Sequence, residues 1–234
     1  MKPEEIKALV GRTAADQNVR SGMKVGMGTG STAVWAIRRI GELVGEGSLS
    51  DILVVPTSFQ STIECQKQTL SVRSLNDPDI GGMLDVTIDG ADEVDGDMRL
   101  TKGGGAALLI EKLVAYNSEQ VVIVVDESKL VEHLGLSFAI PIEVHPEARV
   151  AVSRALERIH ARGELRMALR KMGPVITDNG NLIIDATLES ARDPVELESL
   201  LNSIPGVMEN GLFTRCSPIV YVADAKGTVR TLGR

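Results

Sequence analysis

The feature that most constrains this chain is the alternation of short aliphatic runs with amphipathic segments, up to about residue 137. Aromatic residues make up only 3% of its 234 residues, so the core must be built from aliphatic side chains. Strands rich in Val and Ile that alternate with helices are typical of a Rossmann-like parallel sheet with helices on both faces. We expect strands at 23–28, 52–56, 84–89 and 120–126, and helices at 3–19, 31–44, 58–68 and 104–118.

From about residue 138 the order of predicted elements changes to strand, helix, strand, strand, helix, strand. This order predicts a second, smaller split-βαβ (ferredoxin-like) α+β domain. Its helix at 193–204 has Asp193 as a cap and Pro194 at its first position. The other elements are strands at 138–144, 164–170 and 206–213, a helix at 146–162, and a hairpin at 175–187 that turns at Asn179-Gly180. A last strand at 217–224 returns to the first domain. The predicted domains are therefore 1–137 plus 213–234, and 138–212.

Charge and composition exclude several classes of protein. Acidic residues outnumber basic residues by 32 to 25, which argues against nucleic acid or an anionic membrane as the main partner. Acidic residues interrupt the start "MKPEEIKALV", and no apolar run approaches the roughly 18 residues of a membrane helix, so we expect a cytoplasmic protein. Cys65 and Cys216 lie far apart, and the three histidines form no HExxH motif, which argues against a disulfide scaffold or a zinc site.

A glycine-rich turn at 26–33, "GMGTGSTA", joins a predicted strand to a predicted helix. Its spacing Gly28-x-Gly30-x-x-Ala33 matches the dinucleotide-binding fingerprint, but the next strand ends in Pro-Thr-Ser and not in the acid that would hold a ribose. No Gly-Lys-Ser/Thr follows, so the turn is not a Walker A loop. Its amides and hydroxyls could bind phosphate or sugar oxygens at the helix N-terminus, with Ser31 as the cap. The glycines could equally serve only a tight backbone turn.

An acidic cluster, "DGADEVDGD", follows the strand at 84–89 directly. Because ligands of open parallel sheets bind at the carboxyl ends of the strands, Asp89 and Asp92 should lie at the same edge as the glycine turn. An Asp-rich turn with no ligand is the alternative, and the spacing of the cluster does not match a calcium-binding loop.

Lys102 and three glycines open the predicted helix that carries Glu111 within the aliphatic run "LLIEKLV". A solvent-facing Glu111 beside Lys112 is one interpretation. If Glu111 is buried instead, its pKa rises toward neutrality, as a general base requires. Carboxylates and a lysine without histidine, cysteine or metal suit proton transfer next to a carbonyl, in which a base removes the proton and a cation stabilises the enediolate.

Taken together, these motifs resemble the type A family of ribose-5-phosphate isomerases, and they run through nearly the whole chain in order. The matching stretches are "GMGTGST" (26–32), "PTSFQST" (56–62), "DGADEVD" (89–95), "KGGGAALLIEKLVA" (102–115), "VDESKLV" (125–131), "PIEV" (141–144), "ITDNGN" (176–181) and "IPGVMENGLF" (204–213). The resemblance implies interconversion of ribose 5-phosphate and ribulose 5-phosphate without a cofactor or a metal, by a homodimer or homotetramer. It also implies that the large domain is the catalytic, sugar-phosphate-binding one, and we expect the small domain to serve oligomerisation.

The same resemblance implies the roles of individual residues. Glu111 would be the general base, Asp89 and Asp92 would contact sugar hydroxyls and assist proton movement between them, and Lys102 would stabilise the enediolate oxygen. The remaining predicted substrate contacts are Thr29, Gly30, Ser31, Thr32, Gly90, Ala91, Gly103, Gly104, Gly105, Lys129 and Lys7. Lys7, on the first helix, would help to hold the phosphate.

Two other functions are open at this point. A sugar-phosphate-sensing domain without catalytic activity would share such a fold, although a DNA-binding regulator would need a helix-turn-helix segment that we do not find. A nicotinamide-dependent oxidoreductase is supported only by the glycine fingerprint.

Overall fold

The computed structural model describes residues 1–233 and divides them into two compact units. The first unit comprises 1–91, 110–129 and the described residues from 216 on, and the second comprises 92–109 and 130–215. This division differs from the predicted boundaries, because it assigns 92–109, 130–137 and 213–215 to the smaller unit. The sequence pattern could not show which unit each segment belongs to. Hydrophobic periodicity depends on the local secondary structure, and it stays the same when the chain leaves one unit and later returns to it.

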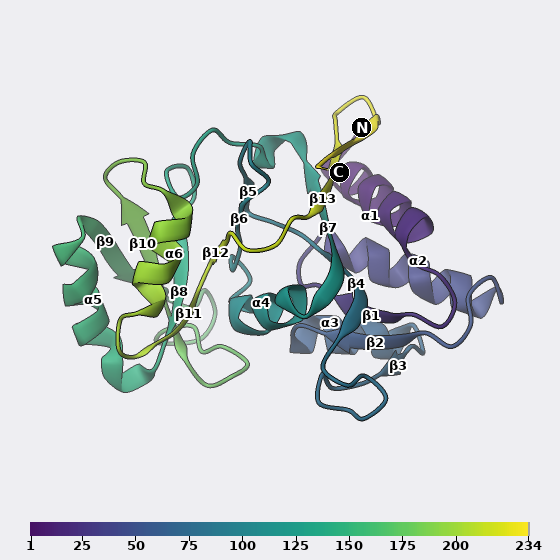
Figure 1. The fold of residues 1–234 in the computed structure, drawn as a ribbon, viewed down its shortest axis with the longest axis horizontal. Helices are drawn as coiled ribbons and strands as arrows, with labels where there is room; N and C mark the ends of the chain where they lie inside the picture. Colours follow the sequence, from purple (N-terminus) through teal and green to yellow (C-terminus); the bar gives the residue numbers. More distant parts are fainter. Residues whose placement is uncertain (234) are drawn as a thin grey trace. The chain divides into compact units, whose positions relative to one another are not determined.

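A seven-stranded sheet forms the centre of the first unit, in the order β14-β13-β7-β4-β1-β2-β3 (Figure 1). All neighbouring strands are parallel except β13 and β14, which are antiparallel. Its strands are β1 (Lys24–Met27), β2 (Leu53–Pro56), β3 (Ser71–Val72), β4 (Leu84–Asp89), β7 (Ser118–Asp126), β13 (Ile219–Ala223) and β14 (Val229–Leu232). The chain runs outward from β1 to β3, then returns to the other side of β1 at β4. The strand order therefore reverses between β1 and β4, and at such a reversal doubly wound sheets bind their ligands.

Helices cover both faces of this sheet, as the alternating pattern predicts. They are α1 (Pro3–Asn18), α2 (Ala33–Gly45), α3 (Phe59–Lys67) and α4 (Leu108–Tyr116). Helices α1 and α2 lie side by side and share one apolar core with β1 and β4 (Figure 1). Helix α4 packs in a second apolar cluster with Val55 and Leu84. Successive strand residues Val54 and Val55 belong to the two different clusters, as expected when side chains alternate between faces.

Two helix starts differ from the prediction. Helix α2 begins at Ala33 behind Thr32, with no side-chain cap, so the predicted cap at Ser31 is wrong. The carbonyls of Gly30 and Thr32 already accept the first amides of that turn. Helix α4 begins at Leu108 and not at 104, because the glycines and Ala106, at φ 59°, form a turn instead. Glu111 consequently lies in the first turn of α4.

The second unit contains an antiparallel sheet in the order β11-β8-β10-β9, which is the order of a split-βαβ fold. Asp193 caps its second helix by accepting hydrogen bonds from two backbone amides, as predicted. The elements are β8 (Ile140–Val144), α5 (Arg149–Arg158), β9 (Ala161–Leu165), β10 (Leu182–Leu188), α6 (Pro194–Asn202) and β11 (Val207–Asn210). Short 3-10 turns are η1 (Glu127–Lys129) in the first unit and η2 (Pro146–Ala148) in the second.

The predicted hairpin "ITDNGN" is held by a fully buried carboxylate. One oxygen of Glu143, on β8, accepts hydrogen bonds from the side chains of Thr177, Asn179 and Asn181 at 2.8 to 3.1 Å. By contrast, the predicted strand at 164–170 is wrong, since β9 ends at Leu165. The segment from Met167 to Gly173 leaves the sheet and exposes Leu169 and Met172 almost completely. Within residues 1–233, no helix is both long and apolar enough to cross a membrane.

Candidate active site

In the first unit, the turns after β1 and β4 lie together at the carboxyl edge of the sheet. The Gly28 amide donates to the Ile88 carbonyl at 3.0 Å. Asp89 is 2% exposed, and one of its oxygens accepts hydrogen bonds from the Thr29 amide at 3.1 Å and the Gly90 amide at 2.7 Å. A Cβ on Gly28 would lie 2.1 Å from that oxygen, so only glycine permits this approach. The structure therefore brings the glycine turn and Asp89 together, as predicted.

Residues after β2 complete this cluster, and the sequence reading did not assign them to the site. The hydroxyl of Thr29 lies 2.8 Å from the hydroxyl of Thr57 and donates to that of Ser58 at 2.7 Å. The side-chain oxygen of Gln60 accepts from the Gly30 amide at 3.1 Å. The polar stretch "PTSFQST" could have predicted these residues, because it begins at the carboxyl end of β2, the neighbour of β1. Ser31 is exposed and Thr32 half-buried at the end of the same turn.

Glu111 is buried, with 4% of its surface exposed, so the interpretation of a solvent-facing glutamate is wrong. Its helix α4 connects two parallel strands, β4 and β7, and must therefore run opposite to them. Its first turn, which carries Glu111, consequently lies at the carboxyl edge of the sheet, where Asp89 also lies. One turn later, Val114 packs against the sheet over Gly26.

The two lysines of the first unit that are predicted to contact substrate, Lys129 and Lys7, occupy different places. Lys129 is half-buried in η1, directly after the carboxyl end of β7, the neighbour of β4. Lys7 lies on α1, where its ammonium donates to Glu4 at 2.9 Å. Gly11, one turn further along the same face, faces the backbone of Thr32 and the Trp35 side chain at the start of α2. The face of α1 that carries Lys7 is thus the face that packs against the N-terminus of α2.

Most of the acidic cluster has a structural role in the second unit. Glu93 accepts hydrogen bonds from the amides of Gly135 and Phe138 at 2.7 and 2.9 Å. Asp95 closes the turn between β5 (Glu93–Val94) and β6 (Leu100–Thr101), accepting from the backbone and side chain of Arg99. Asp97 is exposed and pairs with Arg99. The other two carboxylates of the cluster, Asp89 and Asp92, each accept hydrogen bonds from backbone amides near the predicted site residues.

Asp92 and the Lys102–Gly105 loop form a second group of predicted residues, within the second unit. The carboxylate of Asp92 accepts from the Gly104 amide at 2.8 Å. Lys102 is 3% exposed, and its ammonium lies 5.6 Å from the ring centre of Phe213, on β12 (Leu212–Phe213). Gly103 adopts φ 106° and faces Leu108 and Pro141, so a larger residue there would be strained and crowded.

The structure thus groups the predicted residues by unit. Thr29, Gly30, Asp89 and Gly90 are joined by hydrogen bonds or by the turn itself, and Lys129 and Glu111 lie on elements that reach the same sheet edge. Asp92 and the Lys102–Gly105 loop are joined in the second unit. The chain passes from the first unit to the second at Ala91-Asp92.

The chemistry of the glycine turn does not fit a dinucleotide. A pyrophosphate at such a turn needs its free amides, but the Thr29 amide is taken by the Asp89 carboxylate, whose negative charge also repels phosphate. Among residues 1–233, no group of three or more His, Cys, Asp or Glu side chains is arranged to hold a metal ion.

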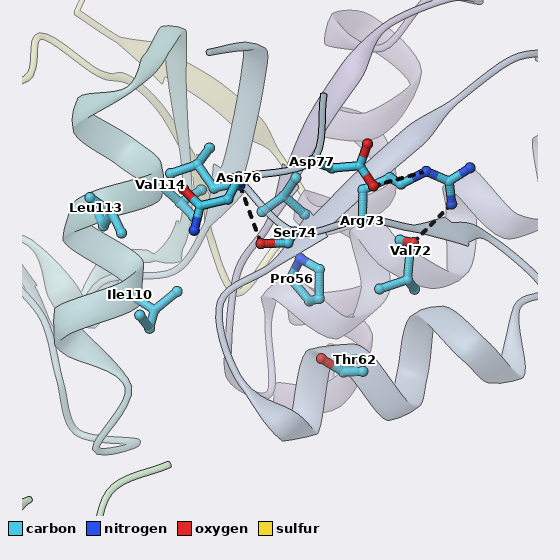
Figure 2. A pocket seen from close by; sticks show the side chains of 12 residues that line it. Pro56, Thr62, Val72, Arg73, Ser74, Asn76, Asp77, Ile110, Leu113 and Val114 are labelled. Carbon is cyan, nitrogen blue, oxygen red and sulfur yellow. Dashed lines mark hydrogen bonds and ion pairs between the residues drawn. The ribbon is translucent and has the colours of Figure 1, made fainter. Parts of the chain in front are cut away.

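A separate pocket of about 520 Å³ opens beside α4 in the first unit (Figure 2). Ile110, Leu113 and Val114 line one side, and the segment from Val72 to Asp77 lines the other. Arg73 is turned toward Asp77 and the Val72 carbonyl and away from the hollow. None of the predicted site residues lines this pocket, so we do not assign it to the site.

Helices α2 and α3, which follow the two turns of the first unit, are joined by an ion pair. Arg38 donates to Glu64 at 2.6 Å, and Glu64 is 7% exposed. This hydrogen bond holds the pKa of Glu64 below its usual value, with charge attraction from Arg38 and Lys67 in the same direction, against the effect of burial.

We expect this pair to make stability depend on pH. Since the pKa of Glu64 is lowered on folding, its contribution is complete above the unfolded value near 4.3 and is lost as the pH falls through the folded value. Glu64→Gln should lower the free energy of unfolding by about 1–2 kcal/mol at pH 7. Thermal unfolding between pH 3 and 7 checks this: the difference from the parent protein should shrink below about pH 4. The exposed Glu46, exchanged for Gln, is the control. A difference that does not change with pH contradicts the assignment.

Comparisons with known proteins identify the family of this chain. The family profile of ribose 5-phosphate isomerase A (phosphoriboisomerase A) matches residues 53–227. A ribose-5-phosphate isomerase A of Treponema denticola is 47% identical over 239 aligned positions, which cover 99% of this chain and 100% of the relative. A solved ribose 5-phosphate isomerase A from Methanocaldococcus jannaschii is 42% identical, with a TM-score of 0.92 over 99% of both chains. A solved D-ribose-5-phosphate isomerase in complex with phospho-erythronic acid is 43% identical, with a TM-score of 0.95 over 100% of both chains. This chain belongs to the ribose 5-phosphate isomerase A family.

Proposed function

We propose that this chain interconverts D-ribose 5-phosphate and D-ribulose 5-phosphate through an enediolate, with Glu111 as the general base. Beside the family membership, the observation that carries the proposal is the burial of three ionisable groups. Asp89, Lys102 and Glu111 are 2%, 3% and 4% exposed. Burying such groups costs free energy, and a site that moves protons is one reason for a fold to tolerate that cost.

The base removes a proton from C2 of the open-chain aldose and returns it to C1. Hydrogen is only moved within the sugar phosphate, so the reaction has no net oxidation and needs no redox cofactor. One carboxylate can serve both carbons, because C1 and C2 are adjacent in the planar enediolate. The aliphatic neighbours of Glu111 on α4 and its burial keep bulk water away from the base.

The other three groups act on the oxygens. Lys102 offers a positive charge to the oxygen that becomes negative in the enediolate. Asp89 and Asp92 contact the sugar hydroxyls, help to open the ring and move the proton between O1 and O2. The contacts of these two carboxylates with backbone amides fix their orientation.

The remaining residues bind the substrate. In the glycine turn the amides of Thr29 and Gly30 bind Asp89 and Gln60, and we assign substrate oxygens to the hydroxyls of Thr29, Ser31 and Thr32 at the helix N-terminus. Gly90, Ala91 and the glycines of the Lys102–Gly105 loop offer backbone groups, and Lys129 and Lys7 offer positive charge to the phosphate. The solved relative that binds phospho-erythronic acid supports this proposal. That ligand carries a phosphate and a planar carboxylate, which resembles the enediolate.

Isomerisation in heavy water tests the function. Incubation with ribose 5-phosphate in D₂O should give ribulose 5-phosphate that carries deuterium at C1, and recovered ribose 5-phosphate with deuterium at C2. NMR of both sugars makes the measurement. Isomer formed without any exchange would argue for a hydride shift and against a shared base. If no isomer forms at all, the proposed function is wrong.

We propose further that the chain works in the cytoplasm as a homodimer or homotetramer, with the small domain at 138–212 taking part in assembly. Exposed apolar side chains in that domain support this, since such patches often mark protein contacts. The side chains of Met167, Leu169, Met172 and Ile176 are each more than half exposed. Light scattering distinguishes an oligomer from a monomer of 25.0 kDa.

A further inference from the structure

The Lys102–Gly105 loop is held on two sides by side chains of its own unit. On one side, the Asp92 carboxylate accepts from the Gly104 amide. On the other side, one guanidinium nitrogen of Arg166 donates to the carbonyls of Gly103 and Gly104, at 2.9 and 3.1 Å. The loop begins from a fixed point, because the Lys102 amide donates to the Gly211 carbonyl at 2.8 Å.

Arg166 is itself fixed in place. Its other two guanidinium nitrogens donate to both oxygens of Asp185, on β10. The side chains of this pair are 16% and 27% exposed, so solvent weakens the pair less than it would on an open surface. The backbone of Arg166 is also anchored, since its amide donates to the Ile183 carbonyl and its carbonyl accepts from the Val175 amide, both at 2.9 Å.

Holding these carbonyls determines where the loop amides point. In a trans peptide the carbonyl and the next amide N–H point in opposite directions. Drawing the carbonyls of Gly103 and Gly104 toward Arg166 therefore turns the amides of Gly104 and Gly105 away from it, toward the side on which Asp92 receives the Gly104 amide. Three consecutive glycines would otherwise populate many conformations, and ordering them costs conformational entropy.

We propose that Arg166, oriented by Asp185, is a positioning residue for the isomerase reaction. It fixes the backbone of the Lys102–Gly105 loop before substrate binds, so that Asp92, the Gly105 amide and Lys102 are already oriented. A lysine could not replace it, because a single ammonium cannot bind both carboxylate oxygens side by side and reach two carbonyls. The expected effect on kinetics rests on the proposed function. The expected effect of Arg166 on the order of the Lys102–Gly105 loop does not.

Steady-state kinetics with ribose 5-phosphate tests the kinetic part. We expect Arg166→Met to lower kcat/KM about 30-fold, mostly in kcat, since loss of orientation at a reacting group costs up to about a hundredfold. Arg166→Lys and Asp185→Asn should each lose activity by a smaller factor. Arg162→Met is the matched control, because Arg162 lies on β9 and pairs with Glu164 at the surface. It should stay within about twofold of the parent protein.

Hydrogen exchange measured by mass spectrometry tests the structural part without substrate. In Arg166→Met the peptide that covers 102–106 should take up deuterium faster, while peptides from β8 and β10 should exchange as in the parent protein. Exchange that is unchanged in the loop, or activity within threefold of the parent protein, overturns the proposal. A third result also overturns the proposal. If kcat falls in Arg166→Met, Arg166→Lys and Asp185→Asn, and exchange is faster throughout the small sheet in all three variants, the role of Arg166 is purely structural. If the parent protein fails to isomerise ribose 5-phosphate, the proposed function is wrong. The exchange result then still shows whether Arg166 holds the Lys102–Gly105 loop in place.

Discussion

Glu111→Gln should lower kcat for ribose 5-phosphate about ten-thousandfold, the upper range for loss of a general acid–base group. The amide has the shape of the carboxylate and cannot accept the carbon-bound proton. Glu111 is 4% exposed, so no solvent-exposed group can readily take its place. Coupled assays of ribulose 5-phosphate formation give kcat, and calorimetric titration with ribose 5-phosphate gives the affinity. We expect the dissociation constant to change by less than about fivefold, because binding rests mainly on the phosphate and hydroxyl contacts.

Two further variants separate chemistry from folding. Glu119→Gln changes an exposed glutamate of β7 in the same unit and should leave kcat unchanged. Glu111→Asp keeps the carboxylate but withdraws it by one methylene, and should recover part of the activity that Gln loses. Near-parental turnover by Glu111→Gln would remove this residue from the base role, whatever the fate of the other assignments.

The fold class was predictable because its signal is local. The family, the mostly parallel sheet and the smaller antiparallel sheet are confirmed. The strand at 84–89 and the Asp193 cap lie at the predicted residues, because periodicity and capping depend on near neighbours. The strands β5 and β6 were not predicted, since strands of two residues are too short to show a periodic pattern.

Errors arose where the backbone departs from regular geometry. The predicted helix at 104–118 includes Gly104, Gly105 and Ala106, because the apolar pattern of α4 extends backward through them. Ala106 adopts φ 59°, a left-handed conformation that an alanine rarely takes and that no sequence rule indicates. This turn lets the backbone of Gly103 and Gly104 contact Arg166 and Asp92, and it places Glu111 in the first turn of α4.

The part of the candidate site that lies at the carboxyl ends of the parallel strands was predictable from the sequence. Asp89 and the glycine turn were expected to lie together, because β1 and β4 both end at the carboxyl edge. Arg166 was not predictable in this way. It lies 63 and 62 residues beyond the glycines whose carbonyls it binds, and it appeared within a predicted strand as one of several basic residues. Only the three-dimensional arrangement distinguishes it from the exposed Arg162.

Gly28→Ala should lower kcat/KM several-hundredfold, because a displacement of about 1 Å in a reacting group already costs about a hundredfold. The added Cβ would lie 2.1 Å from the Asp89 carboxylate oxygen and 2.6 Å from the Asp89 Cα. The side chain could rotate away, but the Cα belongs to the backbone. The ends of β1 and β4 must therefore separate, which disturbs the Thr29 and Gly90 hydrogen bonds to Asp89 together.

The same crowding should lower the free energy of unfolding by about 2–3 kcal/mol, as for other overpacked positions. Kinetics must therefore be measured well below the unfolding midpoint, which a thermal melt provides. Gly45→Ala is the matched control, because Gly45 ends α2 with nothing within 4 Å of the added Cβ, and both kcat/KM and stability should stay near those of the parent protein. A Gly28→Ala protein that folds and turns over normally would show that Asp89 does not need its observed position. Its contacts with the glycine turn would then serve only the backbone turn.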